Sequence, residues 1–233
     1  MPMPWFIWKG KNSLGDFGLW INKLPPIVRA SERVTEVTIP GRPGTVTMLE
    51  GDDVYDQVTR QCTVLIRNDI PIQPVLEWLR GSGELTFSNE ADKVYFARIG
   101  AEVSFSRISN DISQAKITFA CEPLKGRVHA VQDAVTLTAN GTIRNPGDVA
   151  SRPVVEITGS GNCTVTIGDQ SMTFYSVSGT IKVDCDAQII TSSGILWNGT
   201  FTGDFWKIPK GVSNVTINNK VSTMTITPRW RWV

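Results

Sequence analysis

The amino-acid sequence predicts a mainly β protein of two β-sandwich domains, the first of which carries one short helix. Three observations lead to this prediction: residues alternate between apolar and polar through most segments, turn-forming residues recur at short intervals, and the composition changes near residue 127. Residues 1–127 hold 15 basic and 15 acidic side chains, whereas residues 128–233 hold only 8 and 7 and are rich in threonine. We therefore expect one domain over residues 1–127 and a second, wholly β domain over residues 128–233.

In the first half, the alternation predicts strands. Arg60, Cys62, Val64 and Ile66 are expected on one face of a strand, and residues 94–99 and 116–121 show the same period of two. These segments supply the sheets of the first domain.

One segment of the first half breaks this period. Ile72, Val75 and Leu79 recur at helical spacing, Asp69 precedes them as a candidate N-cap, and Gly81 follows as a stop. The spacing predicts a helix over about residues 71–80, with its apolar stripe lying on a sheet.

The second half shows strand patterns throughout. Apolar residues alternate with polar ones over residues 163–167, 181–186 and 223–227. Turn signals separate the strands: Asn140-Gly141, Asn145-Pro146-Gly147-Asp148, Gly159-Ser160-Gly161 and Asn198-Gly199. Short strands with frequent turns predict a compact antiparallel sandwich.

The charge balance and the rare residues exclude several functions. A formal net charge of +1 gives no electrostatic basis for nucleic-acid binding, and a single histidine excludes a His-rich metal site. No stretch approaches the ~20 apolar residues that cross a bilayer, and no targeting signal is visible. The four cysteines are far apart in the sequence and fit small buried hydrophobes in a reducing compartment. We expect a protein made in the cytoplasm, with no cofactor, no metal and no membrane partner.

The best enzymatic candidate is a pair of carboxylates. Asp184 and Asp186 are two residues apart on a predicted strand, which would place them about 7 Å apart on one face, a separation that some glycosidases use. A solvated strand face explains the pair more simply. We therefore expect no enzymatic activity.

The tryptophans leave two interpretations open. In Arg229-Trp230-Arg231-Trp232, strand alternation would place both rings on one face and both guanidinium groups on the other. Either this segment is a contact surface, because Trp and Arg dominate interface hot spots, or its rings complete the second core. Exposed rings could also stack on sugars, so a glycan-binding adhesion module is the alternative function. The two functions differ in whether four rings are buried or line an open groove: Trp197, Trp206, Trp230 and Trp232.

A rigid turn is predicted at Pro40-Gly41-Arg42-Pro43-Gly44. The prolines restrict the backbone, and Gly41 and Gly44 permit the positive φ that a tight reversal needs. The turn would present Arg42 in a fixed direction, which suits a subunit contact better than an ordinary hairpin with a solvated arginine.

This turn belongs to a series of motifs that resembles the siphophage distal tail proteins. In the first half the motifs are Phe6-Ile7-Trp8-Lys9-Gly10, Pro40-Gly41-Arg42-Pro43-Gly44, Trp78-Leu79-Arg80-Gly81 and Tyr95-Phe96-Ala97. In the second half they are Asn145-Pro146-Gly147-Asp148, Ser151-Arg152-Pro153 and Pro228-Arg229-Trp230-Arg231. The resemblance spans nearly the whole chain. Pro43 departs from the family, which often has a polar residue at that position.

The resemblance implies a structural protein of the virion, assembled in the host bacterial cytoplasm and located at the distal end of the tail. Its N-terminal domain would form a homohexameric ring, and its C-terminal domain would be galectin-like. The ring would join the tail tube protein to a hub protein of the tail tip, of the tail-associated lysin type, and leave a channel for DNA. Receptor-binding or baseplate proteins are further expected partners. The expected contact residues are Pro40, Gly41, Arg42, Gly44, Arg229, Trp230, Arg231 and Trp232.

Overall fold

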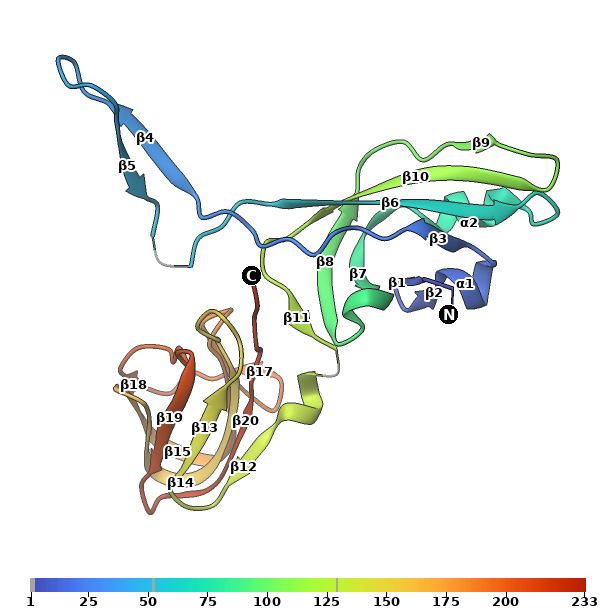
Figure 1. Cartoon of the computed structure of the whole chain (residues 1–233). Helices are drawn as coiled ribbons and strands as arrows, with labels where there is room; N and C mark the ends of the chain where they lie inside the picture. Colours follow the sequence, from blue (N-terminus) through green and yellow to red (C-terminus); the bar gives the residue numbers. More distant parts are fainter. Residues whose placement is uncertain (1–2, 52, 129) are drawn as a thin grey trace. The chain divides into compact units, whose positions relative to one another are not determined.

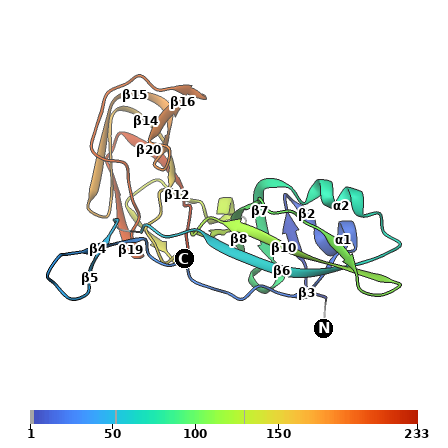
Figure 2. The same ribbon diagram turned by 90° about the horizontal axis from the view of Figure 1, so that it is seen from above.

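Antiparallel strands account for most of the structure, so the prediction of a mainly β fold is confirmed. The computed structural model describes residues 3–51, 53–128 and 130–233. The chain divides into two compact units, the first comprising Met1–Val128 and Val233 and the second His129–Trp232. Figures 1 and 2 show the strands of each unit curled into its own antiparallel sheets.

The main sheet of the first unit has the strand order β2-β1-β7-β8-β10-β6-β3, with β9 paired to β10 and β11 paired to β8. β6 and β10 pair along their whole length. As predicted, β6 buries Arg60, Cys62, Val64 and Ile66 on one face. The strands of this sheet are β1 (Phe6–Trp8), β2 (Lys11–Asn12), β3 (Trp20–Lys23), β6 (Val58–Arg67), β7 (Gly81–Phe87), β8 (Lys93–Ile99), β9 (Phe105–Arg107), β10 (Ile112–Cys121) and β11 (Gly126–Arg127).

The expected helix is confirmed as α2 (Ile72–Trp78), which buries Val75 and Trp78. The prediction that Asp69 caps it is wrong. Pro71 occupies the N-cap position without a side-chain hydrogen bond, and the Asp69 carboxylate pairs with the Arg67 guanidinium at 2.7 Å instead.

A second helix, α1 (Ser13–Phe17), was not predicted from the sequence. Asn12 Oδ1 accepts hydrogen bonds from the backbone N–H groups of Leu14 and Gly15, and the helix ends at Gly18 with φ of 61°. Five residues make little more than one turn, which is too short for a helical period to show in the sequence. Two short 3₁₀ helices, η1 (Ser88–Glu90) and η2 (Ala130–Asp133), complete the helical elements of the described residues.

The core of the first unit contains two tryptophans whose indole N–H groups each donate a hydrogen bond to the other's backbone carbonyl. Trp8 Nε1 donates to the Trp78 carbonyl at 3.2 Å, and Trp78 Nε1 donates to the Trp8 carbonyl at 3.0 Å. Both indole N–H groups are therefore satisfied in an apolar interior, where an unpaired donor would be costly. This pair fixes α2 against β1.

The main sheet of the second unit has the strand order β12-β20-β14-β15-β16-β17, with β18 on β15 and β19 joining β13 to β14. The prediction of short strands fails for β14 and β15, which form one long hairpin paired along nearly its whole length. The strands are β12 (Val135–Leu137), β13 (Gly141–Asn145), β14 (Val154–Ile167), β15 (Gln170–Asp184), β16 (Ile189–Ser192), β17 (Ile195–Leu196), β18 (Phe201–Thr202), β19 (Gly211–Ile217) and β20 (Val221–Thr227).

The turn predicted at Gly159-Ser160-Gly161 is also wrong, because these residues lie inside β14. The strand register shifts between Gly161 and Cys163, where Gly161 has φ of 86°. A Cβ on Gly159 would lie 2.5 Å from the Lys220 carbonyl oxygen. These glycines therefore allow a β-bulge and a close backbone approach, the other common reason for glycine in a strand.

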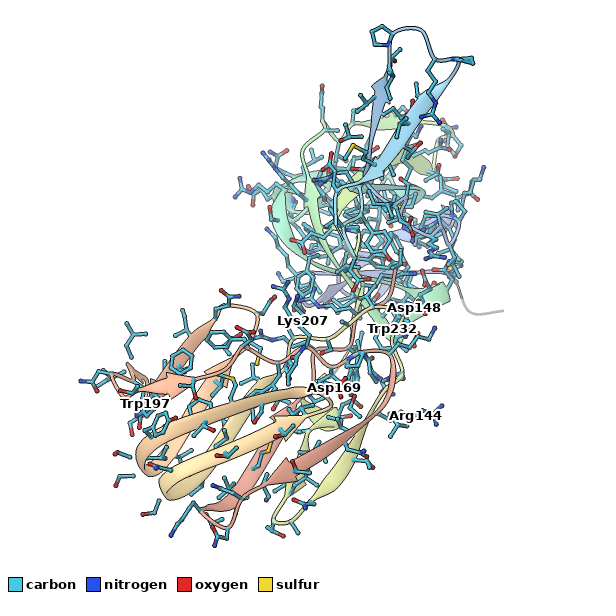
Figure 3. The ribbon with its side chains drawn as sticks, turned by 90° about the vertical axis from the view of Figure 1, so that its left-hand side faces the viewer. Arg144, Asp148, Asp169, Trp197, Lys207 and Trp232 are labelled. Atoms are coloured by element: carbon cyan, nitrogen blue, oxygen red, sulfur yellow. The ribbon has the colours of Figure 1, made fainter. Side chains whose placement is uncertain are left out.

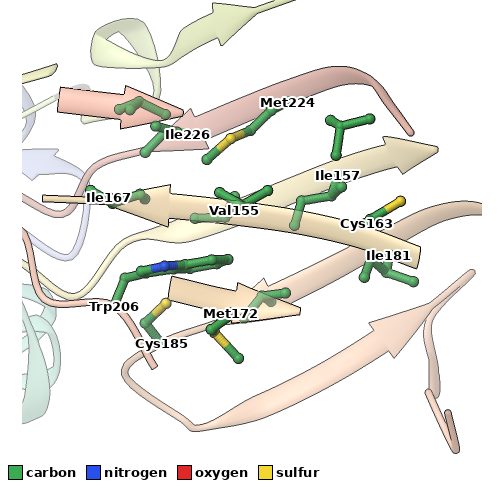
Figure 4. Packing of buried hydrophobic residues seen from close by; sticks show 14 of the residues in the cluster. Val155, Ile157, Cys163, Ile167, Met172, Ile181, Cys185, Trp206, Met224 and Ile226 are labelled. Atoms are coloured by element: carbon green, nitrogen blue, oxygen red, sulfur yellow. The ribbon is translucent and has the colours of Figure 1, made fainter. Parts of the chain in front are cut away.

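The four cysteines are buried and free, as predicted. Figure 4 shows Cys163 and Cys185 among the aliphatic side chains and Trp206 in the core of the second unit. Burial raises the pKa of the Cys62, Cys121 and Cys185 thiols to about 12. Since the thiolate is the reactive form, these thiols act as apolar packing groups.

Candidate assembly surface

A two-stranded hairpin stands apart from the main sheet of the first unit. It consists of β4 (Val34–Thr38) and β5 (Thr45–Leu49), which pair with each other and with no other described strand. Figure 1 shows this hairpin projecting beyond the sheet of its unit. Only Val46 of the two strands is partly covered, and the other residues are exposed. We call residues 34–49 the arm.

The tip of the arm is the turn that the sequence singled out. Gly41 and Gly44 both have φ of 81°, the left-handed region that the sequence required of them. The Arg42 N–H donates to the Ile39 carbonyl at 3.1 Å and closes the turn. The predicted contact residues Pro40, Gly41, Arg42 and Gly44 are all exposed here.

The two faces of the arm differ in character. Directly paired residues share a face, so the pairs Thr35↔Met48 and Val37↔Val46 lie on one side of the ribbon, followed toward the tip by Ile39. We call Val37, Ile39, Val46 and Met48 the apolar stripe. The opposite face is apolar only at its base and carries Glu36 and threonines beyond it.

The apolar stripe is exposed to solvent in the single chain: Val37 is 41% and Met48 58% exposed. An isolated two-stranded hairpin is at best marginally stable in water, and natural proteins seldom leave apolar strands with free edges uncovered. The arm therefore has the chemistry of an element that another surface covers. Sequence reasoning selected only the turn, although the alternation of valine, isoleucine and methionine with threonine along residues 35–48 was a signal for the stripe.

At the root of the arm, the chain that enters β4 and the chain that leaves β5 are held to each other by backbone hydrogen bonds and one ion pair. Arg33 N–H donates to the Val54 carbonyl at 3.0 Å, and Asp56 N–H donates to the Ser31 carbonyl at 2.9 Å. The Asp56 carboxylate, 2.9 Å from Arg33 Nε, raises the pKa of that guanidinium. The chain entering and leaving the arm is thus paired before β4 begins.

A buried group that we call the Arg60 cluster holds the segment just before this root. Arg60 is 3% exposed and donates to the carbonyls of Pro26 and Val28 and to the Tyr95 hydroxyl. Tyr95 in turn donates to Glu90, which pairs with Lys125 Nζ at 3.3 Å.

The Tyr95 ring lies at the centre of the Arg60 cluster. Its centroid is 5.0 Å from the Arg60 guanidinium carbon and 5.8 Å from Lys125 Nζ. Burial and the hydrogen bond to Glu90 raise the pKa of Tyr95, so the hydroxyl stays protonated as a donor. Arg60 therefore positions the chain that leads into the arm.

The C-terminal contact candidates, residues 229–232, lie in the second unit. Their tryptophan rings and their guanidinium groups have different surroundings. Trp230 is 4% exposed and belongs to the core, and Trp232 packs against the same core. Arg229 binds Asp184 through two nitrogens at 2.8 and 2.7 Å, and Arg231 lies 3.8 Å from Asp186. Of the two interpretations, completion of the core accounts for Trp230, while the arginines pair with carboxylates on the other face.

The same ion pairs change the interpretation of the carboxylate pair. The prediction that Asp184 and Asp186 share a strand face is wrong, because β15 ends at Asp184 and the chain turns there. Asp184 Oδ1 also accepts from the backbone N–H groups of Asp186 and Ala187. The bond from Arg229 holds the pKa of Asp184 below its ordinary value, whereas a general acid needs a raised pKa. The Asp184 carboxylate therefore stays ionised and is unsuited to act as a general acid.

We expect Asp184→Asn to lower the free energy of unfolding at pH 7 by about 1 kcal/mol, since the paired groups are only partly buried. The pKa of Asp184 is lower in the folded protein than its ordinary value of 3.8. The ion pair therefore contributes its full stabilisation above pH 3.8, and this stabilisation is lost as the pH falls through the folded-state pKa. Urea unfolding of both proteins at a series of pH values measures this difference. A difference that persists unchanged in strong acid would contradict the assignment to the ion pair.

The tryptophans of the second unit do not form a sugar-binding groove. Trp206 is fully buried and donates from Nε1 to the Gln170 carbonyl, and Trp197 packs edge-to-face against Phe174. Figure 3 places Trp197 and Trp232 on opposite sides of the unit. A hollow of about 550 Å³ over β14, β15 and β16 is lined by hydroxyls, glycines and the Glu156–Lys182 pair, with no aromatic ring.

The described residues contain neither a metal-binding cluster nor a membrane-spanning helix. No group of three or more His, Cys, Asp or Glu side chains is placed to hold a metal ion within residues 3–51, 53–128 and 130–233. Over the same residues, no helix has the length and apolar character needed to cross a membrane.

Comparison with solved structures identifies a protein of the same fold. The crystal structure of Dit (gp 19.1) of phage SPP1, described as a paradigm of the hub adsorption apparatus in phages that infect Gram-positive bacteria, superimposes with a TM-score of 0.75. The match covers 100% of both chains at 16% sequence identity. No protein-family model and no curated protein sequence matches this chain. The fold is therefore that of a phage Dit protein from end to end.

Proposed function

We propose that this chain is the distal tail protein of a siphophage or prophage, a structural component that connects the tail tube to the tail tip. The observation that carries the proposal is the likeness of fold over the full length of both chains. The order of sequence motifs supports it independently of the fold. The proposal places the protein in the virion, after assembly in the host cytoplasm.

In this proposal the first unit forms a homohexameric ring. A closed ring of identical subunits needs two different, complementary surfaces on each subunit. The arm is suited to be one of them, since its apolar stripe is uncovered in the single chain and the segment just before its root is held by Arg60. One face of the ring would bind the tail tube protein and the other the hub protein of the tip, with receptor-binding or baseplate proteins as further neighbours.

The lumen of such a ring would be a channel for DNA. The formal net charge of +1 fits a conduit, because a strongly basic lumen would bind passing phosphates. The glycan-binding alternative lacks support, since Trp206 and Trp230 are buried.

Light scattering behind a sizing column, over a range of protein concentrations, tests the ring. A mass of six subunits is expected at high concentration. A monomer at every concentration would contradict ring formation by this chain alone.

We expect Arg42→Ala to weaken ring assembly roughly tenfold while the monomer melts normally, because the side chain is exposed in the single chain and would be paired only in the ring. The same scattering series measures the assembly. Arg144→Ala, which removes an exposed arginine of β13 in the second unit, is the matched control. Equal assembly of all three proteins would exclude a contact role for Arg42.

A further inference from the structure

The chain contains two Asn-Gly pairs, and both are followed by threonine: Asn140-Gly141-Thr142 and Asn198-Gly199-Thr200. Asn140 directly precedes β13, whereas Asn198 lies in the connection between β17 and β18 (Figure 1). The two pairs thus have the same local sequence on the side where an Asn-Gly pair reacts. A difference in their reactivity is therefore expected to come from the structure around them.

An Asn-Gly pair can lose its side-chain amide without an enzyme. The backbone nitrogen of the glycine attacks Cγ of the asparagine, so that a new N–Cγ bond forms and the Cγ–Nδ2 bond breaks. Nδ2 leaves as ammonia and takes up the proton of the attacking nitrogen. Water then opens the five-membered imide at either carbonyl, which gives aspartate or, with the backbone continued through Cγ, isoaspartate. Glycine favours the reaction because it has no Cβ to obstruct the approach.

The structure holds both reacting groups of the first pair in place. Asn140 Oδ1 accepts a hydrogen bond from the Ile217 N–H at 2.9 Å. Gly141 is the first residue of β13 and is paired with Val215 of β19. Before the Gly141 nitrogen could attack, the Asn140 side chain would have to leave its hydrogen bond and the start of β13 would have to separate from β19.

The second pair has no such restraint. Asn198 and Gly199 are both exposed and lie outside the strands. Among the described residues, neither the Asn198 side chain nor the Gly199 N–H takes part in a hydrogen bond. No bond has to be broken before the Gly199 nitrogen approaches the side-chain carbonyl carbon of Asn198.

We propose that Asn198 is a site of spontaneous deamidation in the folded protein and that the fold protects Asn140. Water is the only co-reactant, and no group is oxidised or reduced. The product carries a carboxylate within residues 187–203, a segment that contains no Asp, Glu, Lys or Arg. The inference concerns the second unit and does not depend on the ring proposed for the first.

Peptide mapping of the full chain after incubation in a mildly alkaline buffer tests the proposal. Trypsin releases residues 183–207 with Asn198 as their only asparagine, and residues 128–144 with Asn140 as theirs. Each deamidation adds about 1 Da, so mass spectrometry gives the rate at each site. We expect Asn198 to react at least about tenfold faster than Asn140. Equal rates, a faster reaction at Asn140 or an unchanged Asn198 would overturn the proposal.

Incubation in urea measures what the fold contributes. Unfolding releases Asn140 from Ile217, so we expect the two rates to converge through a faster reaction at Asn140. If the difference between the sites persisted undiminished in urea, the preceding residue, Ala139 or Trp197, would be its cause. The assignment to the structure would then be wrong.

The products identify the route. Attack by the Gly199 nitrogen gives both isoaspartate and aspartate, whereas direct hydrolysis of the side-chain amide gives aspartate alone. An isoaspartyl methyltransferase, which transfers a methyl group to isoaspartate and not to aspartate, is therefore expected to label peptide 183–207 of the incubated protein. A product that contained only aspartate would overturn the route through Gly199.

Two variants assign the change of charge, which isoelectric focusing measures. Asn198→Gln keeps a side-chain amide but would have to form a larger ring, so we expect no acidic form over the time in which the parent acquires one. Asn219→Gln is the matched control, because it changes an exposed asparagine that is followed by lysine and is expected to acquire the acidic form at the parental rate. Gly199 is kept, since a Cβ there would overlap the Trp197 ring. An acidic form in Asn198→Gln equal to that of the parent would overturn the assignment to Asn198.

Discussion

If this chain assembles into the proposed ring, Val37→Asp is expected to convert the ring to monomers, weakening association by at least about 100-fold, without lowering the melting temperature of the monomer. Val37 lies in the middle of the apolar stripe and is 41% exposed in the single chain. A carboxylate at this position is solvated in the monomer, where surface changes cost within about 0.5 kcal/mol. In an apolar contact the same carboxylate would be buried without a partner, at a cost of several kcal/mol.

Scattering mass against concentration, together with a melting curve, measures both halves of this prediction. Thr38→Asp is the matched control, since it places the same charge one residue along the strand on the opposite face. If Thr38→Asp dissociated the ring and Val37→Asp did not, the polar face of the arm would be the buried one. If neither variant changed the mass, the arm would not be a ring contact.

Arg60→Met is expected to lower the free energy of unfolding by about 2–3 kcal/mol and to expose the chain before the arm to proteases. The carbonyls of Pro26 and Val28 would lose their donor in a partly buried site, and the buried space of the Arg60 side chain would be filled in large part by methionine. Urea unfolding and limited proteolysis, with cleavage mapped to residues 24–33, measure the two effects.

The contrast between variants makes the assignment specific. Tyr95→Phe keeps the ring beneath the guanidinium and removes only the hydroxyl that links Arg60 to Glu90, so we expect a smaller loss of about 1 kcal/mol and no new cleavage. Val37→Asp should leave the proteolysis pattern of the monomer unchanged. Cleavage at residues 24–33 in the parent protein at the same rate as in Arg60→Met would show that Arg60 does not hold this segment.

The sequence predicted those elements whose pattern is long enough to show a period. β6 was predicted from the alternation that starts at Arg60, and α2 from apolar residues at helical spacing. α1 was too short for either signal. The glycines at 159 and 161 predict a turn because a turn and a β-bulge need the same backbone freedom, and only the neighbouring Lys220 distinguishes the two.

The candidate surface was predicted only in part, for a related reason. The Pro40–Gly44 turn is a local signal, so it was found. The partners of Arg60 lie 32 to 35 residues away along the chain, and no local pattern can reveal them. The Arg229–Asp184 pair likewise joins residues 45 positions apart. In the sequence, the aspartates and the C-terminal arginines therefore look like two unrelated motifs, whereas in the structure they form one group of ion pairs.

The arm gives a proposed ring a simple thermodynamic property. Because each subunit would offer one arm and receive one, an open row of subunits always leaves one apolar stripe in water, whatever its length. Only closure covers every stripe, and the last contact forms within one particle, without a further loss of translational freedom. Incomplete rings would therefore be sparsely populated intermediates between monomers and the closed form.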